Sequence, residues 1–281
     1  MTAFVSKLQK ISINAAWIGL DVLSMYCHGN RSKWEACASA FKEMLVHLPL
    51  NRGQKKQQLE MHYWEEAAKR ILDDNDADFA WSLTMQIVAS CDDNMHYGDM
   101  HHYIKPIIRL LFRNYGRDIW PIFAEALRTA DPLHEYRLTE LLSSEDRSDR
   151  NSPSVLADLP EEVLTEWCKR EPDMAPEIVA TATEAFIEVG GEYQMSPTAQ
   201  FLLDEFGDNE HVRSSLSANM GSFGWTGSVV PYHEREVTAL EPLLNHIRPS
   251  VAVWAKRRIS YLKQSIEIES VRDSEKQYGI Y

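Results

Sequence analysis

Residues 231–266 read PYHEREVTALEPLLNHIRPSVAVWAKRRISYLKQSI, and their pattern is the clearest indication of the architecture. Its first half carries apolar residues three or four positions apart, a spacing that places them on one face of a helix. These residues are Val237, Leu240, Leu244 and Ile247. Arg248-Pro249-Ser250 then interrupts the helix, because a proline fits the first turn of a new helix but not the interior of an existing one.

The second half of the stretch carries a matching apolar stripe. It consists of Val251, Trp254, Ala255, Arg258, Tyr261, Leu262 and Ile266. A break this short forces the two helices to run antiparallel, stripe against stripe. The stretch therefore predicts a helical hairpin in which Trp254 is buried against Leu244 or Val237.

Apolar stripes at helical spacing recur along the rest of the chain. In the first expected helix, residues 4–27, one face holds Leu8, Ile11, Ala15, Ile18 and Val22. We expect further helices over 34–45 and 59–71, over 79–87 after an Asp73–Asp76 turn that supplies an N-cap, and separately over 104–111 and 119–127.

Later segments follow the same pattern. Asp158-Leu159-Pro160-Glu161 predicts a helix start with Asp158 as its cap. A helix through Ile178 and Phe186 is expected to end at Gly190-Gly191. Because no convincing period-two strand or Asn-Gly hairpin turn occurs, the sequence predicts an all-α protein.

Length, charge and cysteines restrict the class of protein. The 281 residues, 44% hydrophobic and 25% charged, are ordinary for a globular chain of one large or two small domains. A net charge of −13 argues against a nucleic-acid partner, because phosphate binding needs clustered cations. We expect no membrane partner and a cytoplasmic location, with reduced core thiols at Cys27, Cys37, Cys91 and Cys168.

A helix, a short Asp/Asn/Pro turn and a second helix recur along the chain, at Leu72-Asp73, Ala130-Asp131-Pro132, Phe206-Gly207-Asp208-Asn209 and Ile247-Arg248-Pro249. The last two turns lie about 40 residues apart, the period of HEAT and armadillo repeats. Residues 243–249, LLNHIRP, followed by Val251, Trp254 and Ala255, resemble a HEAT-type hairpin. Together with Gly224-Trp225-Thr226-Gly227-Ser228, they resemble the closing region of large bacterial helical-repeat proteins. The resemblance implies a HEAT/armadillo-like α-solenoid that acts as a scaffold, and it brings no catalytic residues.

The polar string SSEDRSDRNSPS at 143–154 contains no apolar residue and predicts a surface connection. We therefore expect N-terminal helical hairpins over 1–142, a connection over 143–157 and C-terminal HEAT-like hairpins over 158–281, with one continuous solenoid as the alternative.

Two groups of residues are candidates for function. Lys105, Arg109, Arg113 and Arg117 recur every four residues, which predicts one exposed basic stripe that docks an acidic partner. Trp225, in an aromatic loop, is a further partner-binding candidate if it is exposed.

Residues 91–102 are the densest group of potential metal ligands in the chain. The candidates are His96, Asp99, His101 and His102. We expect a non-enzymatic protein-interaction scaffold, or a subunit of a larger bacterial assembly, without a cofactor. The alternative is a metal-dependent or nucleic-acid-modifying enzyme on a helical-repeat fold.

Overall fold

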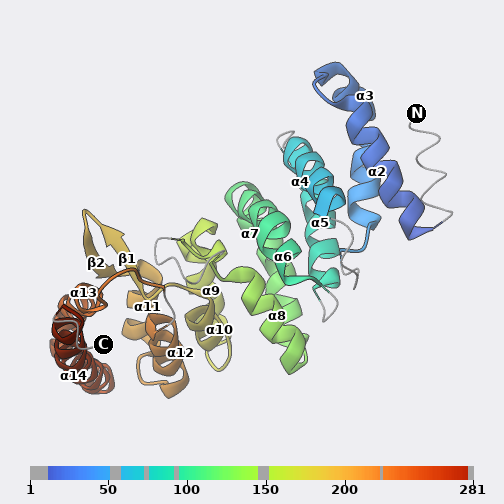
Figure 1. Ribbon diagram of the computed structural model, residues 1–281. Coiled ribbons are helices and arrows are strands. Elements are labelled where there is room, and N and C mark those ends of the chain that lie inside the picture. The colour runs from blue at the N-terminus through green and yellow to red at the C-terminus, as the bar shows by residue number, and fades with distance from the viewer. Residues whose placement is uncertain are drawn as a thin grey trace. The chain divides into compact units, whose positions relative to one another are not determined.

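The computed structural model describes residues 12–50, 58–72, 76–91, 95–144, 152–221 and 224–277. Helices dominate these ranges, with one two-stranded sheet among them (Figure 1). The predicted all-α class is confirmed. Within the described ranges, no helix combines the length and the apolarity that crossing a bilayer requires.

Contacts divide the chain into two compact units. Unit 1 comprises Met1–Leu142 with Asp158–Val163, and unit 2 comprises Ser143–Ala157 with Leu164–Tyr281. The polar connection expected over 143–157 stays a prediction. At its ends, however, Ser144 and Ser154 are buried and pair with each other in an isolated antiparallel bridge.

Unit 1 is a stack of helices that pack on their near neighbours in the chain. Helix α2 contacts α3 and α4, α3 contacts α5, and α7 contacts α4, α5 and α8. The bounds of these elements are α2 (Ile13–Cys27), α3 (Arg31–His47), α4 (Gln58–Leu72), α5 (Ala77–Ser90), α6 (Tyr97–Asp99), the π-helix η1 (Met100–Ile104), α7 (Lys105–Thr129) and α8 (Pro132–Leu142).

Side-chain caps start several of these helices. The Ser12 hydroxyl accepts from the amide of Ala15 at 3.1 Å, and the Asp76 carboxylate accepts from the amide of Phe79 at 2.9 Å. The N-cap predicted at the end of the Asp73–Asp76 turn is thus confirmed for Asp76. Such caps satisfy amides that have no partner inside the helix.

The predicted apolar face of the first helix is wrong where the structure describes it. Ile18 and Val22 are 55% and 41% exposed, while Trp17 and Leu20 are buried. Helix α2 is apolar on most of its surface, so its sequence offers two stripes. Packing on α3 and α4 selects the stripe that carries the tryptophan.

The two helices expected over 104–111 and 119–127 form one continuous helix, α7, although Pro121 lies inside it. Pro121 is exposed, so its ring does not disturb the buried side of α7. One buried stripe runs the whole length and includes Ile108, Tyr115, Ile119 and Phe123. Burial of this stripe outweighs the backbone hydrogen bond that the proline cannot make.

Unit 2 contains shorter helices and the sheet. Helix α12 packs on α10 and α11, while α13 packs on α14 and on β2. The bounds are η2 (Val155–Asp158), α9 (Glu161–Arg170, which begins in unit 1), α10 (Ala175–Ala182), β1 (Phe186–Val189), β2 (Glu192–Met195), α11 (Pro197–Phe206), α12 (Glu210–Gly221), α13 (Val230–Leu240), η3 (Glu241–Asn245) and α14 (Pro249–Gln277).

The helix expected to run through Phe186 ends instead at Ala182, and a β-hairpin follows. Strands β1 and β2 pair antiparallel, with Phe186 opposite Met195 and Val189 opposite Glu192. Gly190 and Gly191 have φ values of 64° and 88°. Two successive positive φ values are typical of a two-residue hairpin turn, so the glycines join two strands rather than end a helix.

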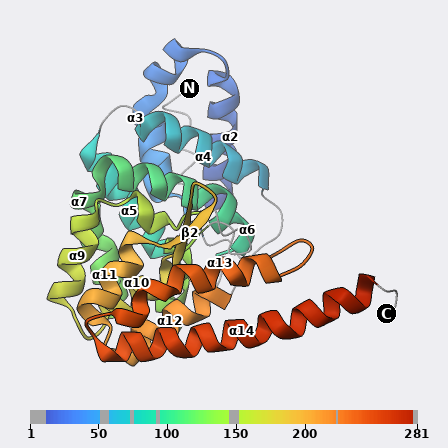
Figure 2. The ribbon, with the colours of Figure 1, turned by 90° about the vertical axis from the view of Figure 1, so that its left-hand side faces the viewer.

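The C-terminal hairpin exists, but its break comes earlier than expected. Helices α13 and α14 run in opposite directions (Figure 2) and pack on each other. Because Pro242 lies two residues after Leu240, α13 ends at Leu240 and the chain continues as the 3-10 helix η3. Leu244 and Ile247 are therefore turned to solvent, at 40% and 90% exposure.

All four cysteines are buried thiols, as expected for core positions. Burial raises the pKa of Cys168 to about 12. Burial, followed by a hydrogen bond with Cys37, raises the pKa of Cys27 to about 11. Thiols with such raised pKa values are poor nucleophiles at neutral pH.

Candidate functional site

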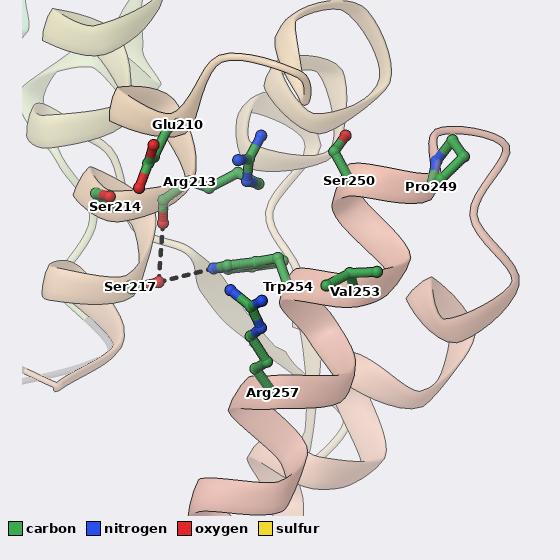
Figure 3. A pocket seen from close by; sticks show the side chains of 9 residues that line it. All are labelled: Glu210, Arg213, Ser214, Ser217, Pro249, Ser250, Val253, Trp254 and Arg257. Atoms are coloured by element: carbon green, nitrogen blue, oxygen red, sulfur yellow. Dashed lines mark hydrogen bonds between the residues drawn. The ribbon is translucent and has the colours of Figure 1, made fainter.

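A groove between α12 and α14, with a volume of about 350 Å³, is the strongest candidate site in unit 2 (Figure 3). We call it the α12–α14 groove. Four of its lining residues come from α12 and five from α14. They are Glu210, Arg213, Ser214 and Ser217, and Pro249, Ser250, Val253, Trp254 and Arg257.

Helical geometry explains why these residues share one groove. On α12, Arg213 and Ser217 are four residues apart, and on α14, Trp254 and Arg257 are three apart. Both spacings place side chains on one face of a helix. The groove therefore has two regular walls, each formed by about two helical turns.

Beside the groove, the turn before α14 contacts the last part of α11 and the turn before α12. His246 Nε2 lies 2.8 Å from Asp204 Oδ1, and Arg248 Nη1 lies 2.6 Å from Asp208 Oδ2. The Ser250 hydroxyl donates to Asp208 Oδ1 at 2.5 Å. The hydrogen bonds from Ser250 and Arg248 lower the pKa of Asp208. These contacts hold the start of α14 against α12.

Gly207 makes this close approach possible. A Cβ atom there would lie 2.3 Å from Val251 Cγ2 and 2.2 Å from the Leu203 carbonyl oxygen. Its φ of −63° is ordinary for any residue. The position thus requires glycine for space, and not for backbone conformation.

Trp254 joins the two walls. Its indole Nε1 donates to Ser217 Oγ at 2.8 Å, and that hydroxyl donates to the Arg213 carbonyl at 2.8 Å. The expected burial of Trp254 against Leu244 or Val237 is therefore wrong, because the half-buried indole bonds to α12. The Ser217 proton is engaged by a carbonyl, which does not activate the hydroxyl as a nucleophile.

The remaining polar groups of the groove are available to a ligand. Arg213 Nη1 donates to the Gly207 carbonyl at 2.5 Å. Among the residues that the structure describes, no hydrogen bond or ion pair engages the side chain of Glu210, Ser214 or Arg257. The groove thus presents two guanidinium groups, one carboxylate and hydroxyls around an aromatic ring. These groups are suited to binding a polar segment that has an anionic group.

The predicted basic stripe is not a free cationic surface. Lys105 is fully buried, so the prediction that it is exposed is wrong. Arg109 Nη1 and Arg113 Nε each lie 2.7 Å from a carboxylate oxygen of Asp158, which was expected to cap a helix.

The fourth stripe residue, Arg117, is also paired: it bonds Glu162 in the first turn of α9. Both acids follow their arginines by 45 residues or more. Periodicity within one helix contains no information about such distant partners. Binding of a partner by the stripe stays a prediction.

The candidate metal ligands do not converge. His101 is buried, with Nε2 3.4 Å from Glu140 Oε1 and its ring centre 4.0 Å from that of Tyr97. His96 and His102 are exposed. The described residues contain no group of three or more His, Cys, Asp or Glu side chains that could hold a metal ion.

Of the remaining candidates, Asp99 is half-buried, and Trp225 is 54% exposed.

Sequence reasoning did not identify the α12–α14 groove. The available signal was the matched spacing of polar residues on two helices that each follow a predicted repeat turn. Only the fold, which places these faces of α12 and α14 on the two sides of one groove, gives that signal meaning.

No protein-family model and no curated protein matches the chain. Two solved structures, both of engineered proteins, align with it at low similarity. One is 13% identical with a TM-score of 0.28, and the alignment covers 94% of this chain and 96% of that one. The other is 14% identical with a TM-score of 0.27, covering 92% of this chain and 68% of that one. Neither alignment carries an argument about function.

Proposed function

We propose that this protein is a non-enzymatic interaction module that holds a segment of a partner protein in the α12–α14 groove. The observation that carries the proposal is the set of groups in the groove that have no partner in the described structure: Glu210, Ser214 and Arg257. Such groups offer hydrogen bonds and charge to a ligand. Ser217, the serine bonded to Trp254 across the groove, is held by an indole and a carbonyl instead of by a base.

We further propose that the helical hairpins form a HEAT-like solenoid that serves as a scaffold or subunit of a larger bacterial, cytoplasmic assembly. Two observations support this: helices pack on their near neighbours within each unit, and residues 243–255 resemble a HEAT-type hairpin. Small-angle X-ray scattering tests the arrangement, because a solenoid has a larger radius of gyration than a compact globule of equal length. A compact profile would contradict it.

Selection from a displayed random-peptide library tests the binding function. We expect the purified full chain to enrich peptides with a common pattern. Ser214→Trp should abolish their binding, since this exposed position lines the groove and a large side chain would fill it. Ser260→Trp is the matched control, because Ser260 is an exposed serine of α14 outside the groove. Failure to enrich any peptide, or equal binding by Ser214→Trp, would contradict the proposal.

A further inference from the structure

We propose that the α12–α14 groove recognises an acidic residue next to an apolar one in an extended peptide. The peptide carboxylate binds Arg257, and the apolar side chain packs on Trp254 and Val253. This inference rests on the proposed function, since it names the ligand chemistry of the same groove.

The carboxylate position follows from the two arginines. Arg257 is exposed and extends from α14 toward Trp254 (Figure 3), and no described residue neutralises it. Arg213 donates Nη1 to the Gly207 carbonyl and also interacts with the Asp208 carboxylate, so its charge is partly offset while that of Arg257 is not. A guanidinium presents planar, paired donors that match the two oxygens of a carboxylate. An acidic side chain is therefore the complementary group.

The apolar position follows from the residues beside Arg257. Val253 is 50% exposed, and Trp254 is half-buried with its indole nitrogen held by Ser217 at 2.8 Å. Because that hydrogen bond restricts the ring, little side-chain freedom is lost when a ligand packs on it. A fixed aromatic surface next to an exposed valine fits an aliphatic side chain.

Glu210 distinguishes a peptide from a small anion. Its carboxylate lines the same groove and is not paired in the described structure. It would repel inorganic phosphate or a phosphorylated side chain, which carries close to two negative charges at neutral pH. The backbone amides of an extended peptide, in contrast, can donate to Glu210, so the whole lining is used only by a peptide.

The net charge of −13 does not prevent such binding. At physiological ionic strength the Debye length is about 8 Å, so distant acids are largely screened while a contacting guanidinium is not. Recognition therefore depends on Arg257 and not on the overall field of the protein.

Fluorescence anisotropy with three labelled pools of short peptides tests the inference. The pools share a central leucine preceded by Glu, Gln or Lys. We expect the Glu pool to bind at least about tenfold more tightly than the other two, as hydrogen bonds to charged groups contribute about 1.5–3 kcal/mol. Arg257→Gln should remove this preference. Lys263→Gln, an equal loss of charge at an exposed position of α14 outside the groove, should preserve it.

The outcomes separate the two proposals. If all three pools bind equally and Ser214→Trp abolishes binding, the acidic preference is overturned and the interaction function stands. Tighter binding of a phosphoserine pool than of the Glu pool would also overturn the carboxylate assignment. If no pool binds and library selection also fails, both proposals are overturned.

Discussion

The arginines of α7 and those of the α12–α14 groove differ in how the structure neutralises them. The α7 arginines recur every four residues on one helix, whereas Arg213 and Arg257 come from the two walls of the groove. On α7, Arg109 and Arg113 share the carboxylate of Asp158. In the groove, Arg257 has no such partner among the described residues. The difference shows that the availability of a charge depends on what a distant segment places beside it.

The two sets also stabilise the protein differently. The side chains of Arg109 and Asp158 are 12% and 14% exposed, so their pair is largely removed from water and contributes to unit 1 itself. Arg257 is exposed and its loss leaves no buried group unpaired. We expect substitutions at the first set to change stability, and substitutions at the second to change binding.

Asp158→Ala should have the largest effect on stability, about 3 kcal/mol, because it leaves the largely buried Arg109 without its counter-charge. Urea unfolding followed by circular dichroism measures the loss. Glu162→Ala is the control: it breaks the exposed pair with Arg117 and should cost under about 1 kcal/mol. Equal losses for the two variants would show that burial does not distinguish these pairs.

Gly207→Ala should destabilise unit 2 by about 2 kcal/mol, because its new methyl group overlaps Val251 and the Leu203 carbonyl. Gly221→Ala, the control in α12, meets no atom within 4 Å and should be nearly neutral. Adding Val251→Ala should not restore stability fully, since the carbonyl clash remains. A fully stable Gly207→Ala protein would mean that α14 approaches α12 less closely.

Trp254→Phe should cost about 1 kcal/mol, the usual net contribution of one hydrogen bond, because the ring stays but its donor to Ser217 is lost. Ser217→Ala should cost a similar amount. In a double-mutant cycle the two losses should not add, as they remove the same bond. Additive losses would indicate that the two side chains stabilise unit 2 independently.

Acid should have the smallest of these effects on stability, through the contacts of Asp208 with Arg248 and Ser250. Ser250 and Arg248 hold the pKa of Asp208 below its ordinary value, so the unfolded chain binds the proton more readily. The stabilising contribution is complete above the ordinary aspartate pKa of about 4 and is lost as the pH falls through the lowered pKa.

Urea midpoints measured between neutral pH and about pH 3 check this effect. Asp208→Asn should lose less stability over that range than the wild type, because the asparagine has no carboxylate to protonate. Some loss should remain in both proteins, because Asp76 and other acids still titrate. Parallel curves for the two proteins would remove Asp208 from the explanation.

Local sequence rules predicted the helical class and several details correctly. The Asp76 cap depends on one side chain and an amide three residues away, so sequence alone could identify it. Residues 231–266 contain enough apolar periodicity to predict two packed antiparallel helices. The exact end of α13 was missed, although Pro242 was visible in the sequence.

Other features depended on competition between two local patterns. The glycines at 190–191 fit either a helix end or a hairpin turn, and pairing of Phe186 with Met195 selects the turn. Pro121 predicts a break in an isolated helix, but the buried stripe of α7 keeps that helix continuous. Periodicity cannot rank such alternatives, because the energy that separates them comes from packing.

The helical class and the residues that start many of the helices thus follow from local sequence, since these features depend on neighbours within a few positions. Which charged side chains remain available to a ligand depends instead on contacts between distant segments. Asp158 neutralises two arginines that precede it by 45 and 49 residues, whereas Ser217 meets Trp254 across 37 residues to form the groove. Spacing places a side chain on a helical face, but the element packed against that face decides whether it is paired or free to bind.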